Sequence, residues 1–287
     1  MVGKEPFTKM TDRLLQIETN PFQSRFHVTA GITVRTGGVG APPYDTLNMA
    51  FYAGDKAEAV RENRRRVATD TGFALSDWTV AEQVHGSRII KVGTEHRGHG
   101  AYSDADSVGK ADGLYTEEAN VLLASFFADC VPLYFFAPDQ GFIGLVHAGW
   151  KGTAQNIGGT FIRTWEKEEK ISPETIYAVI GPAISQLNYE VDNHVIAKMK
   201  AVLPNENEKP WRPVGNNRFH LDLKEMNRQL LAAEGLPVNQ IVVSGHCTYD
   251  EEDLFFSYRR EHGRTGRMLA FIGRKSQQEE KNRRKST

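Results

Sequence analysis

Cysteine is scarce in this chain of 287 residues, which contains only Cys130 and Cys247 and no C-x-x-C spacing. Two isolated thiols exclude a disulfide framework and the redox or zinc motifs built on paired cysteines. Long hydrophobic runs are also missing, since the apolar run at residues 121–127 is far shorter than the ~20 residues of a membrane-spanning helix. The first 25 residues carry both signs of charge and no apolar core of signal-peptide length. We therefore expect a cytoplasmic protein with reduced thiols and no membrane partner.

A strong charge of one sign is absent too. The 35 Lys and Arg residues oppose 36 Asp and Glu residues, which leaves a formal net charge of −1. No global field then favours nucleic acid as a partner, and any anion site must be local. Hydrophobic residues at 40% and charged residues at 25% are ordinary for a folded chain, and the length is compatible with one large domain. Composition leaves the oligomeric state open.

Periodicity and turn residues divide the chain into short elements, with no internal repeat and no interdomain linker. Residues 1–25 are expected to be peripheral, residues 94–110 to form a long polar loop or lid, and residues 275–287 to be a disordered tail. We expect helices at residues 58–71, 154–170, 191–203 and 221–234, the second with Thr153 as a candidate N-cap. We expect strands at residues 26–35, 78–84, 89–92, 175–180, 241–244 and 268–272.

The most informative segment is a predicted β-hairpin. The apolar runs 131–137 and 142–146 flank the turn residues 138–141, Pro-Asp-Gln-Gly. If residues 137 and 142 pair, His147 lies opposite Pro132, two residues from Cys130 and on the same face. Diagonal neighbours of this kind have Cβ atoms ~7 Å apart, and two ligands of one zinc ion need their donor atoms only ~3.5 Å apart. One metal ion could therefore bridge Cys130 and His147.

A metal centre needs a third ligand, and several histidines could supply it. His85 lies at a strand-to-turn junction, where a side chain can face a cleft. Three protein ligands with one open position are typical of catalytic zinc. His96 and His99, spaced H-x-x-H in the polar loop, and His246 beside Cys247 are the alternatives. Each of these groups also has an ordinary reading, because a buried cysteine or a hydrogen-bonded histidine is common in protein cores.

Lys151, Gly152 and Thr153 follow His147 closely and lead into a predicted helix. Free backbone N–H groups at a helix start, beside a lysine, can bind an anion such as phosphate. Arg35, next to a Gly-Gly pair, is a second basic candidate. Both sites have a structural alternative, in which the glycines make a turn and the cations are solvated. The arginines near the C-terminus are more typical of a solvated face: Arg259, Arg260, Arg264 and Arg267.

These motifs resemble the YfiH-like family, which is named for a multicopper polyphenol oxidase (laccase) domain and is also described as peptidoglycan editing factor and purine nucleoside phosphorylase. The resemblance extends from about residue 27 to residue 273, and its most specific blocks are Ala128-Asp129-Cys130 and residues 147–153, HAGWKGT. Further matching segments are residues 35–39, 44–48, 54–55, 60–64, 83–86, 111–113, 180–184, 189–191, 256–260 and 265–267.

The resemblance implies an α/β (α+β) fold: a single catalytic domain at residues 26–274, with mixed β-sheets layered with helices in a sandwich. It also implies a metal site at His85, Cys130 and His147, with Zn²⁺ as the first expectation and a single copper ion as the other. The implied activity is a purine nucleoside phosphorylase acting on adenosine, inosine and S-methyl-5'-thioadenosine, with adenosine deaminase activity. Its partners would be purine nucleosides and phosphate. One departure is Ala183, where some members carry a cysteine.

Two other enzyme classes compete with this interpretation. A laccase needs several copper ions, yet the chain has nine histidines and no H-x-H pair, so a copper-dependent polyphenol oxidase is the weaker reading. A cysteine hydrolase would use Cys130 as nucleophile and His147 as base, which excludes a metal role for the same thiol. A metal-stabilised binding module without catalysis is a further alternative. Asp129 and Glu190 are candidate proton carriers in the phosphorylase reading.

Overall fold

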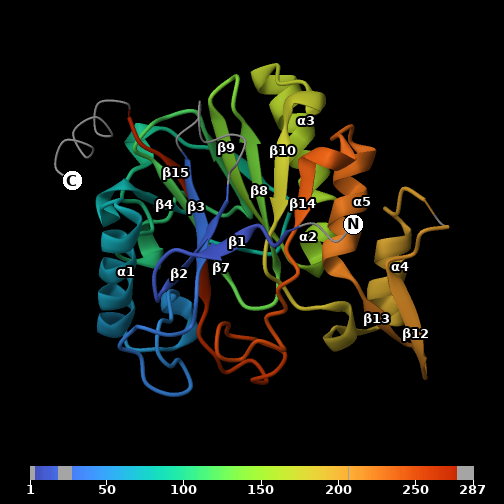
Figure 1. Cartoon of the computed structure of the whole chain (residues 1–287), viewed down its shortest axis with the longest axis horizontal. Coiled ribbons are helices and arrows are strands. Elements are labelled where there is room, and N and C mark those ends of the chain that lie inside the picture. The colour runs from blue at the N-terminus through green and yellow to red at the C-terminus, as the bar shows by residue number, and fades with distance from the viewer. Residues whose placement is uncertain (1–3, 19–27, 206, 277–287) are drawn as a thin grey trace.

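The apolar segments of the chain fold into two six-stranded mixed β-sheets in a computed structural model that describes residues 4–18, 28–205 and 207–276 (Figure 1). The first sheet has the order β1-β2-β3-β15-β7-β4, with bounds Phe7–Lys9, Leu14–Ile17, Val28–Thr33, Met268–Arg274, Leu122–Phe127 and Trp78–Val80. The second has the order β14-β10-β8-β9-β6-β5, with bounds Ile241–Val243, Tyr177–Ile180, Val131–Ala137, Phe142–Ala148, Gly113–Thr116 and Ile89–Lys91. A small third sheet has the order β11-β13-β12, with bounds Glu190–Asp192, Arg218–Leu221 and Trp211–Gly215.

Helices cover the outer faces of both large sheets. Helix α1 (Ala57–Thr71) covers the first sheet, where Val67 packs in one cluster with Phe73 and Trp78. The other helices belong to the core on the far side of the second sheet, which contains Phe135 and Trp165: α2 (Trp150–Ala154), α3 (Ile157–Glu169), α4 (Asn193–Lys200) and α5 (Leu223–Ala233). The expected α/β (α+β) sandwich of mixed sheets and helices is confirmed.

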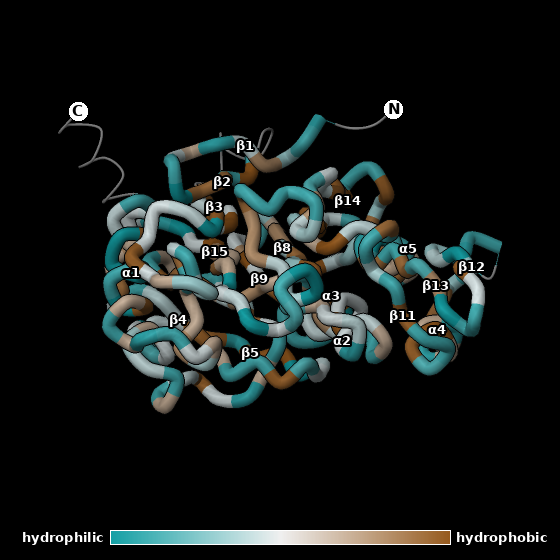
Figure 2. The backbone as a smooth tube through the Cα atoms, turned by 90° about the horizontal axis from the view of Figure 1, so that it is seen from below, coloured by the Kyte–Doolittle hydropathy of each residue, from teal (hydrophilic) through white to brown (hydrophobic). Residues whose placement is uncertain are grey.

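The contact between the two sheets forms a third apolar cluster. It combines residues of the first sheet, such as Phe127 and Ile272, with residues of the second, such as Tyr134, Phe136 and Leu145. The inner strands β8 and β9 are buried along their whole length, because each lies between a helix layer and the other sheet. In Figure 2 these buried strands are coloured as more hydrophobic than the outer helix α1.

The predicted hairpin has the expected register. Strands β8 and β9 pair antiparallel, with Ala137 opposite Phe142 and His147 opposite Pro132. The turn between them closes with N–H groups of Gln140 and Gly141 donating to the Ala137 carbonyl, and Gly141 adopts a φ of 82°. The geometry that brings Cys130 and His147 together is therefore confirmed.

The expected helix at residues 154–170 differs from the observed one. Helix α2 already begins at Trp150, after Gly149, and ends at Ala154. Helix α3 then starts as a separate helix, with Asn156 as its N-cap. The Asn156 side chain accepts a hydrogen bond from the Gly159 N–H, so it caps α3 as an N-cap should. The expectation that Thr153 is an N-cap is therefore wrong.

Two further regions differ from the expectations. The expected peripheral segment at residues 1–25 contains β1 and β2, which extend the first sheet and bury Phe7, Leu14 and Ile17. The loop at residues 94–110 contains two short 3₁₀ turns and is tied to α1, because the buried Arg64 donates to the carbonyls of Gly100 and Ala101. It is thus a packed part of the structure rather than a free lid.

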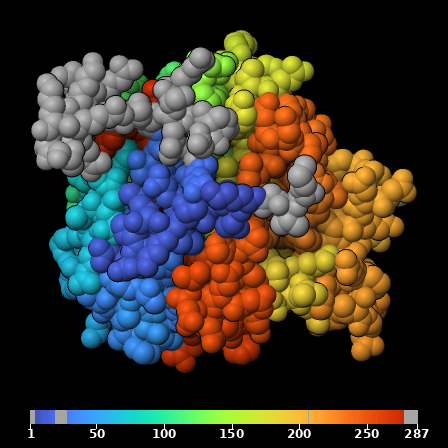
Figure 3. Space-filling view, viewed as in Figure 1, coloured from blue at the N-terminus to red at the C-terminus, as the bar shows by residue number. Residues whose placement is uncertain are grey.

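The N-terminal segment lies against the segment that follows β14, and Figure 3 shows the two side by side on one face. Glu5 makes this contact by accepting hydrogen bonds from the Ser244 hydroxyl and the Gly245 N–H. Most of the expected tail at residues 275–287 lies outside the described residues, and the boundaries 26 and 274 of the expected domain stay predictions. None of the helices in the described part of the chain is long and apolar enough to cross a membrane.

Candidate metal centre and its pocket

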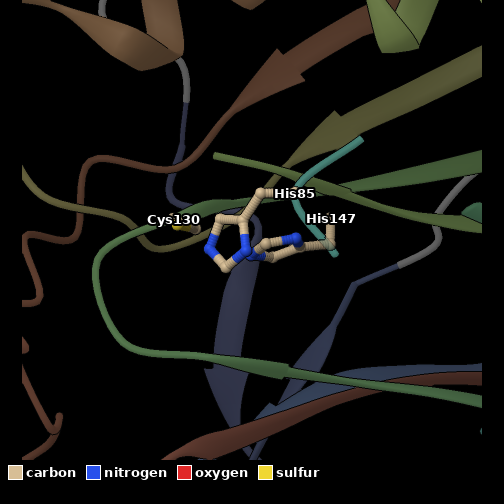
Figure 4. A group of neighbouring side chains, drawn as sticks. All are labelled: His85, Cys130 and His147. Atoms are coloured by element: carbon tan, nitrogen blue, oxygen red, sulfur yellow. The ribbon is translucent and has the colours of Figure 1, made fainter. Parts of the chain in front are cut away.

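Three side chains that can ligate a metal meet at the open end of the hairpin (Figure 4). Cys130 precedes β8, His147 lies near the end of β9, and His85 comes from the turn after β4. Their ligand atoms all lie within 4.8 Å of one another. The imidazole rings of His85 and His147 are 4.8 Å apart between centroids and nearly perpendicular, at 86°. The structure therefore brings together the three predicted ligands, which come from distant parts of the sequence.

Asp112, just before β6, contacts both histidine segments. Its Oδ1 lies 2.9 Å from Nδ1 of the buried His147 and also accepts from the His85 N–H at 3.0 Å. Its Oδ2 accepts from the N–H groups of Val84 at 3.2 Å and Gly86 at 2.7 Å. Burial opposes the charge of Asp112, but the His147 and backbone hydrogen bonds outweigh it and lower the pKa of this carboxyl.

The backbone is in the left-handed region at two positions of the centre. His85 itself has a φ of 58°, and Asp129, which precedes Cys130, has a φ of 84°. Non-glycine residues rarely adopt these angles, and such strain persists only where the surroundings hold it. At Asp129 the carboxylate accepts from the Thr248 hydroxyl and from the Arg259 N–H, both at 2.7 Å. Burial raises the pKa of Asp129, while these hydrogen bonds oppose the rise.

The surroundings of Cys130 and His147 shift the pKa values of the two side chains toward their charged forms, a thiolate beside an imidazolium. Burial disfavours both charges, yet the positive charge and hydrogen bond of His147, followed by those of His85, lower the pKa of Cys130 to about 6. For His147, burial is outweighed by the Cys130 thiolate and the Asp112 hydrogen bond, which raise its pKa to about 9. A thiolate is the form of cysteine that binds a metal, so the centre presents a ready ligand at neutral pH.

A pocket of about 440 Å³ opens onto the three ligands. Its walls combine aromatic rings with cationic side chains, and only a few polar groups interrupt them. The lining residues are Tyr52, Gln83, His85, Phe126, Ala128, Asp129, Cys130, His147, Trp150, Lys151, Ile184, Tyr189, Leu223, Tyr258, Arg259 and Arg267. This combination is typical of a small-molecule site, where apolar walls bind and a few polar groups orient the ligand.

Of the three neighbouring residues predicted to bind an anion, only one lies in the pocket wall. Lys151 lines the pocket, whereas Gly152 and Thr153 are buried in α2 and do not. The Thr153 hydroxyl accepts from the amide of Asn227 at 3.0 Å. Gly152 packs against the turn that carries His85, since a Cβ at this position would lie 3.1 Å from the Gly86 carbonyl oxygen.

Arg35 and Glu190 lie outside the pocket lining as well. The Arg35 guanidinium donates to Glu261 at 2.9 Å and lies over the ring of Phe256, so its charge has partners within the fold. Glu190 is an exposed residue of β11 whose carboxylate lies 3.9 Å from Arg218. The geometry thus supports neither residue as a direct contact of a ligand in this pocket.

The alternative metal ligands have other contacts. His96 accepts from the Gly93 N–H, and His99 lies 3.0 Å from the Asp106 carbonyl oxygen. The ring of His246 lies 2.7 Å from Glu251. Among the described residues, His85, Cys130 and His147 form the single group of three or more such side chains with the geometry for a metal ion.

Sequence reasoning missed several residues of the pocket. Arg259 and Arg267 line it, although their spacing in the sequence is more typical of a solvated face. Their guanidinium groups lie over aromatic rings that also line the pocket, Arg259 over Tyr189 at 5.1 Å and Arg267 over Tyr258 at 5.4 Å. The one available signal was their position in segments that match the family motifs.

The chain is similar to known proteins over most of its length. The family model described as "Multi-copper polyphenol oxidoreductase laccase" matches residues 29–275. A protein of Geobacillus stearothermophilus named "Purine nucleoside phosphorylase YlmD" is 50% identical over 248 residues, which are 86% of this chain and 90% of that protein. Its namesake from Bacillus subtilis is 42% identical over 274 residues, or 94% of this chain and 98% of the relative.

Solved structures show the same fold. The crystal structure of YlmD from Geobacillus stearothermophilus matches with a TM-score of 0.92 and 46% identity, and covers 95% of this chain and 100% of that one. The crystal structure of the Bacillus licheniformis hypothetical protein YfiH matches with a TM-score of 0.91 and 42% identity over the same shares. The chain therefore belongs to the multi-copper polyphenol oxidoreductase laccase family, the YfiH-like group that its hairpin and turn motifs resemble.

Proposed function

We propose that this protein is a metal-dependent purine nucleoside phosphorylase that acts on adenosine, inosine and S-methyl-5'-thioadenosine and also deaminates adenosine. The observation that carries the proposal is the pocket itself, in which metal ligands, aromatic walls and cationic side chains share one space. A nucleoside and a phosphate ion need such a combination, because the flat faces of the purine base stack on aromatic rings and phosphate is an anion. The names of the relatives support the same activity.

His85, Cys130 and His147 would hold the metal ion. Two imidazoles and one thiolate suit zinc, and they also suit a single copper ion. A metal binds the neutral form of His147. Because the Asp112 carboxylate can only accept, the neutral ring would keep its proton on Nδ1 and leave the Nε2 lone pair for the metal. When bound, zinc would supply a Lewis acid that stabilises negative charge on the substrate.

Phosphate would bind to the cations of the pocket, which are Lys151, Arg259 and Arg267. Arg259 lines the pocket, where its guanidinium donates to the Glu190 carbonyl at 2.8 Å and its backbone N–H donates to Asp129, the residue before Cys130. A guanidinium offers two parallel donors to phosphate oxygens, which fixes the ion as well as binding it. This assignment replaces the expected contribution of Arg35, Gly152 and Thr153.

The aromatic residues would bind the purine by stacking. Phe126 and Tyr52 form an edge-to-face pair with ring centroids 6.0 Å apart, and Trp150 and Tyr189 line the same pocket. Phosphorolysis develops positive charge on the sugar and negative charge on the leaving base, so cations and donors near the base lower the barrier. Asp129, which lines the pocket, remains the proposed proton carrier in place of Glu190.

The alternatives fit the pocket less well. A multicopper oxidase needs several metal sites, whereas the described residues contain a single group with metal-ligand geometry. A cysteine hydrolase is favoured by one observation, the lowered pKa of Cys130 beside His147. The two uses of Cys130 exclude each other, so metal content separates them.

The decisive experiment is incubation of adenosine with purified protein, with and without phosphate. We expect release of adenine that depends on phosphate, together with a stoichiometric metal ion that is lost in His85→Ala, Cys130→Ala and His147→Ala. Cys247→Ala is the matched control, because Cys247 is the other cysteine and does not line the pocket. Phosphate-independent release of adenine, or full metal content in the three ligand variants, would overturn the proposal.

A further inference from the structure

We propose that Asp112 is the positioning residue of the metal centre and that its carboxylate organises both histidine ligands at once. The inference rests on the proposed metal site but does not depend on which reaction the site performs. It concerns a residue that touches no substrate in the proposed function, because Asp112 does not line the pocket.

Four N–H groups converge on this one carboxylate. Oδ1 faces the ring Nδ1 of His147 and the backbone N–H of His85, and Oδ2 faces the backbone N–H groups of Gly86 and Val84, all between 2.7 and 3.2 Å. The side chain of Asp112 has no exposed area. A carboxylate has the acceptor capacity for all four donors, and few other side chains do.

The backbone contacts explain how His85 is held in a strained conformation. Its φ of 58° places it in the left-handed region, which an isolated turn would leave readily. Asp112 fixes three consecutive N–H groups of this turn from the second sheet. Gln83 fixes the start of the same turn to the first sheet, since its side-chain amide exchanges hydrogen bonds of 2.9 and 2.8 Å with the backbone of Phe126. The His85 turn is thus attached to both sheets.

The ring contact explains how His147 is oriented. Because the carboxylate accepts, the proton of a neutral His147 stays on Nδ1. The lone pair of Nε2 is then available to ligate a metal. The two residues also contact each other through the backbone, since the His147 N–H donates to the Asp112 carbonyl at 2.7 Å. Residues of this kind around a metal ligand commonly change metal affinity by about 10- to 100-fold when they are replaced.

An amide cannot reproduce this arrangement, although it has nearly the same shape. Each oxygen of Asp112 faces two donors. An asparagine therefore places its NH₂ group either against the N–H groups of Val84 and Gly86, or against the His85 N–H and Nδ1 of His147, which can accept only if the ring proton moves to Nε2. The variant Asp112→Asn must therefore either release N–H groups of the His85 turn or move the proton of His147 to Nε2, the atom that a metal needs. We infer that it weakens metal binding even where the fold is intact.

The test compares Asp112→Asn with Asp77→Asn in the full chain, with zinc affinity measured by competition against a chromophoric chelator. Asp77 is a matched control, because it is also buried, accepts from the Ala74 N–H and pairs with Arg97, but does not line the pocket. We expect zinc to bind Asp112→Asn about 10- to 100-fold more weakly than the wild type, and Asp77→Asn to bind as the wild type does. Equal zinc affinity in the three proteins would overturn the proposal.

A second measurement does not depend on the variant folding. Nitrogen NMR of the wild-type histidines, with and without zinc, reports which ring nitrogen of His147 is protonated. We expect the proton on Nδ1 in the zinc-bound protein, and a proton on Nε2 would overturn the proposal. Failure here is distinct from failure of the metal site, because zinc retained by His85→Ala, Cys130→Ala and His147→Ala would reject the site itself.

Discussion

Gly149 provides a sharp test of the metal centre, because a single methyl group at this position would press on two ligands. A Cβ built on Gly149 would lie 3.0 Å from Sγ of Cys130 and 3.1 Å from Cδ2 of His85. The backbone angles, a φ of −72° and a ψ of 173°, suit alanine as well as glycine. The substitution Gly149→Ala is therefore a purely steric perturbation, aimed at the ligands rather than at the backbone.

Two opposing free-energy terms bear on the stability of Gly149→Ala. Inserting a methyl group into a packed space costs about 1–3 kcal/mol, while replacing glycine by alanine at compatible angles returns about 0.4–1 kcal/mol. The second term acts through the unfolded chain, so only the steric cost of about 1–3 kcal/mol bears on metal binding, and it falls on Cys130 and His85. If the metal requires both ligands in their present positions, zinc affinity falls about 5- to 140-fold, since 1.4 kcal/mol corresponds to a factor of ten.

The assay is zinc competition with a chelator, performed on Gly149→Ala and on Gly86→Ala. Gly86 is a suitable control because it lies beside His85, yet a Cβ there would have ordinary contacts of 3.6 Å to Asp112 and Val84. We expect a clear loss of affinity in Gly149→Ala and almost none in Gly86→Ala. If both variants bind zinc as tightly as the wild type, Cys130 and His85 do not hold the metal in the positions that the structure gives them.

Three further predictions concern pH, stability and substrate. In the metal-free protein the pKa of Cys130 is about 6, since the charge of His147 outweighs burial, so the rate of iodoacetamide alkylation should be near its plateau at pH 7 and fall as the pH drops below 6. A rate that climbs steadily from pH 7 to pH 9 would contradict this. Arg64→Lys should lower the free energy of unfolding by about 2–4 kcal/mol, because the buried guanidinium donates to three carbonyls and an ammonium cannot reach all of them. Denaturant titration measures this change, and an unchanged unfolding midpoint would refute the prediction. Arg259→Gln should raise the KM for phosphate about tenfold or more in steady-state kinetics, because a charge-assisted hydrogen bond is lost. A KM equal to that of the wild type would show that Arg259 does not bind phosphate.

The parts of the fold that sequence predicted well are those with strong local patterns. The register of the β8–β9 hairpin follows from two apolar runs and one turn, so the approach of Cys130 and His147 is already contained in about 18 consecutive residues. Strands β1 and β2 were missed because they are short, mixed in composition and paired at a sheet edge. Their burial depends on the rest of the sheet, which no local window contains.

The candidate site was predictable only in part for the same reason. His85 was a candidate because of its strand-to-turn junction, and the family resemblance implied it as well. Sequence spacing alone could not select it, because its approach to Cys130 requires both sheets to be in place. Arg259 lines the pocket and its backbone N–H donates to Asp129, whereas Arg35, the same residue type, bonds to Glu261. Residue type and spacing do not distinguish these two arginines, whereas the contacts made across the fold do.

The attachment of the His85 turn to both sheets has a consequence for how metal and folding are linked. Cys130 and His147 can meet in any state that forms the hairpin, but His85 joins them only after the sheets pack. The unfolded chain therefore lacks the complete site, and a metal ion that binds the native state selectively must raise its stability. At a free concentration a hundred times the dissociation constant, the gain is about 2.7 kcal/mol. The melting temperature of this protein should thus report how much free metal surrounds it.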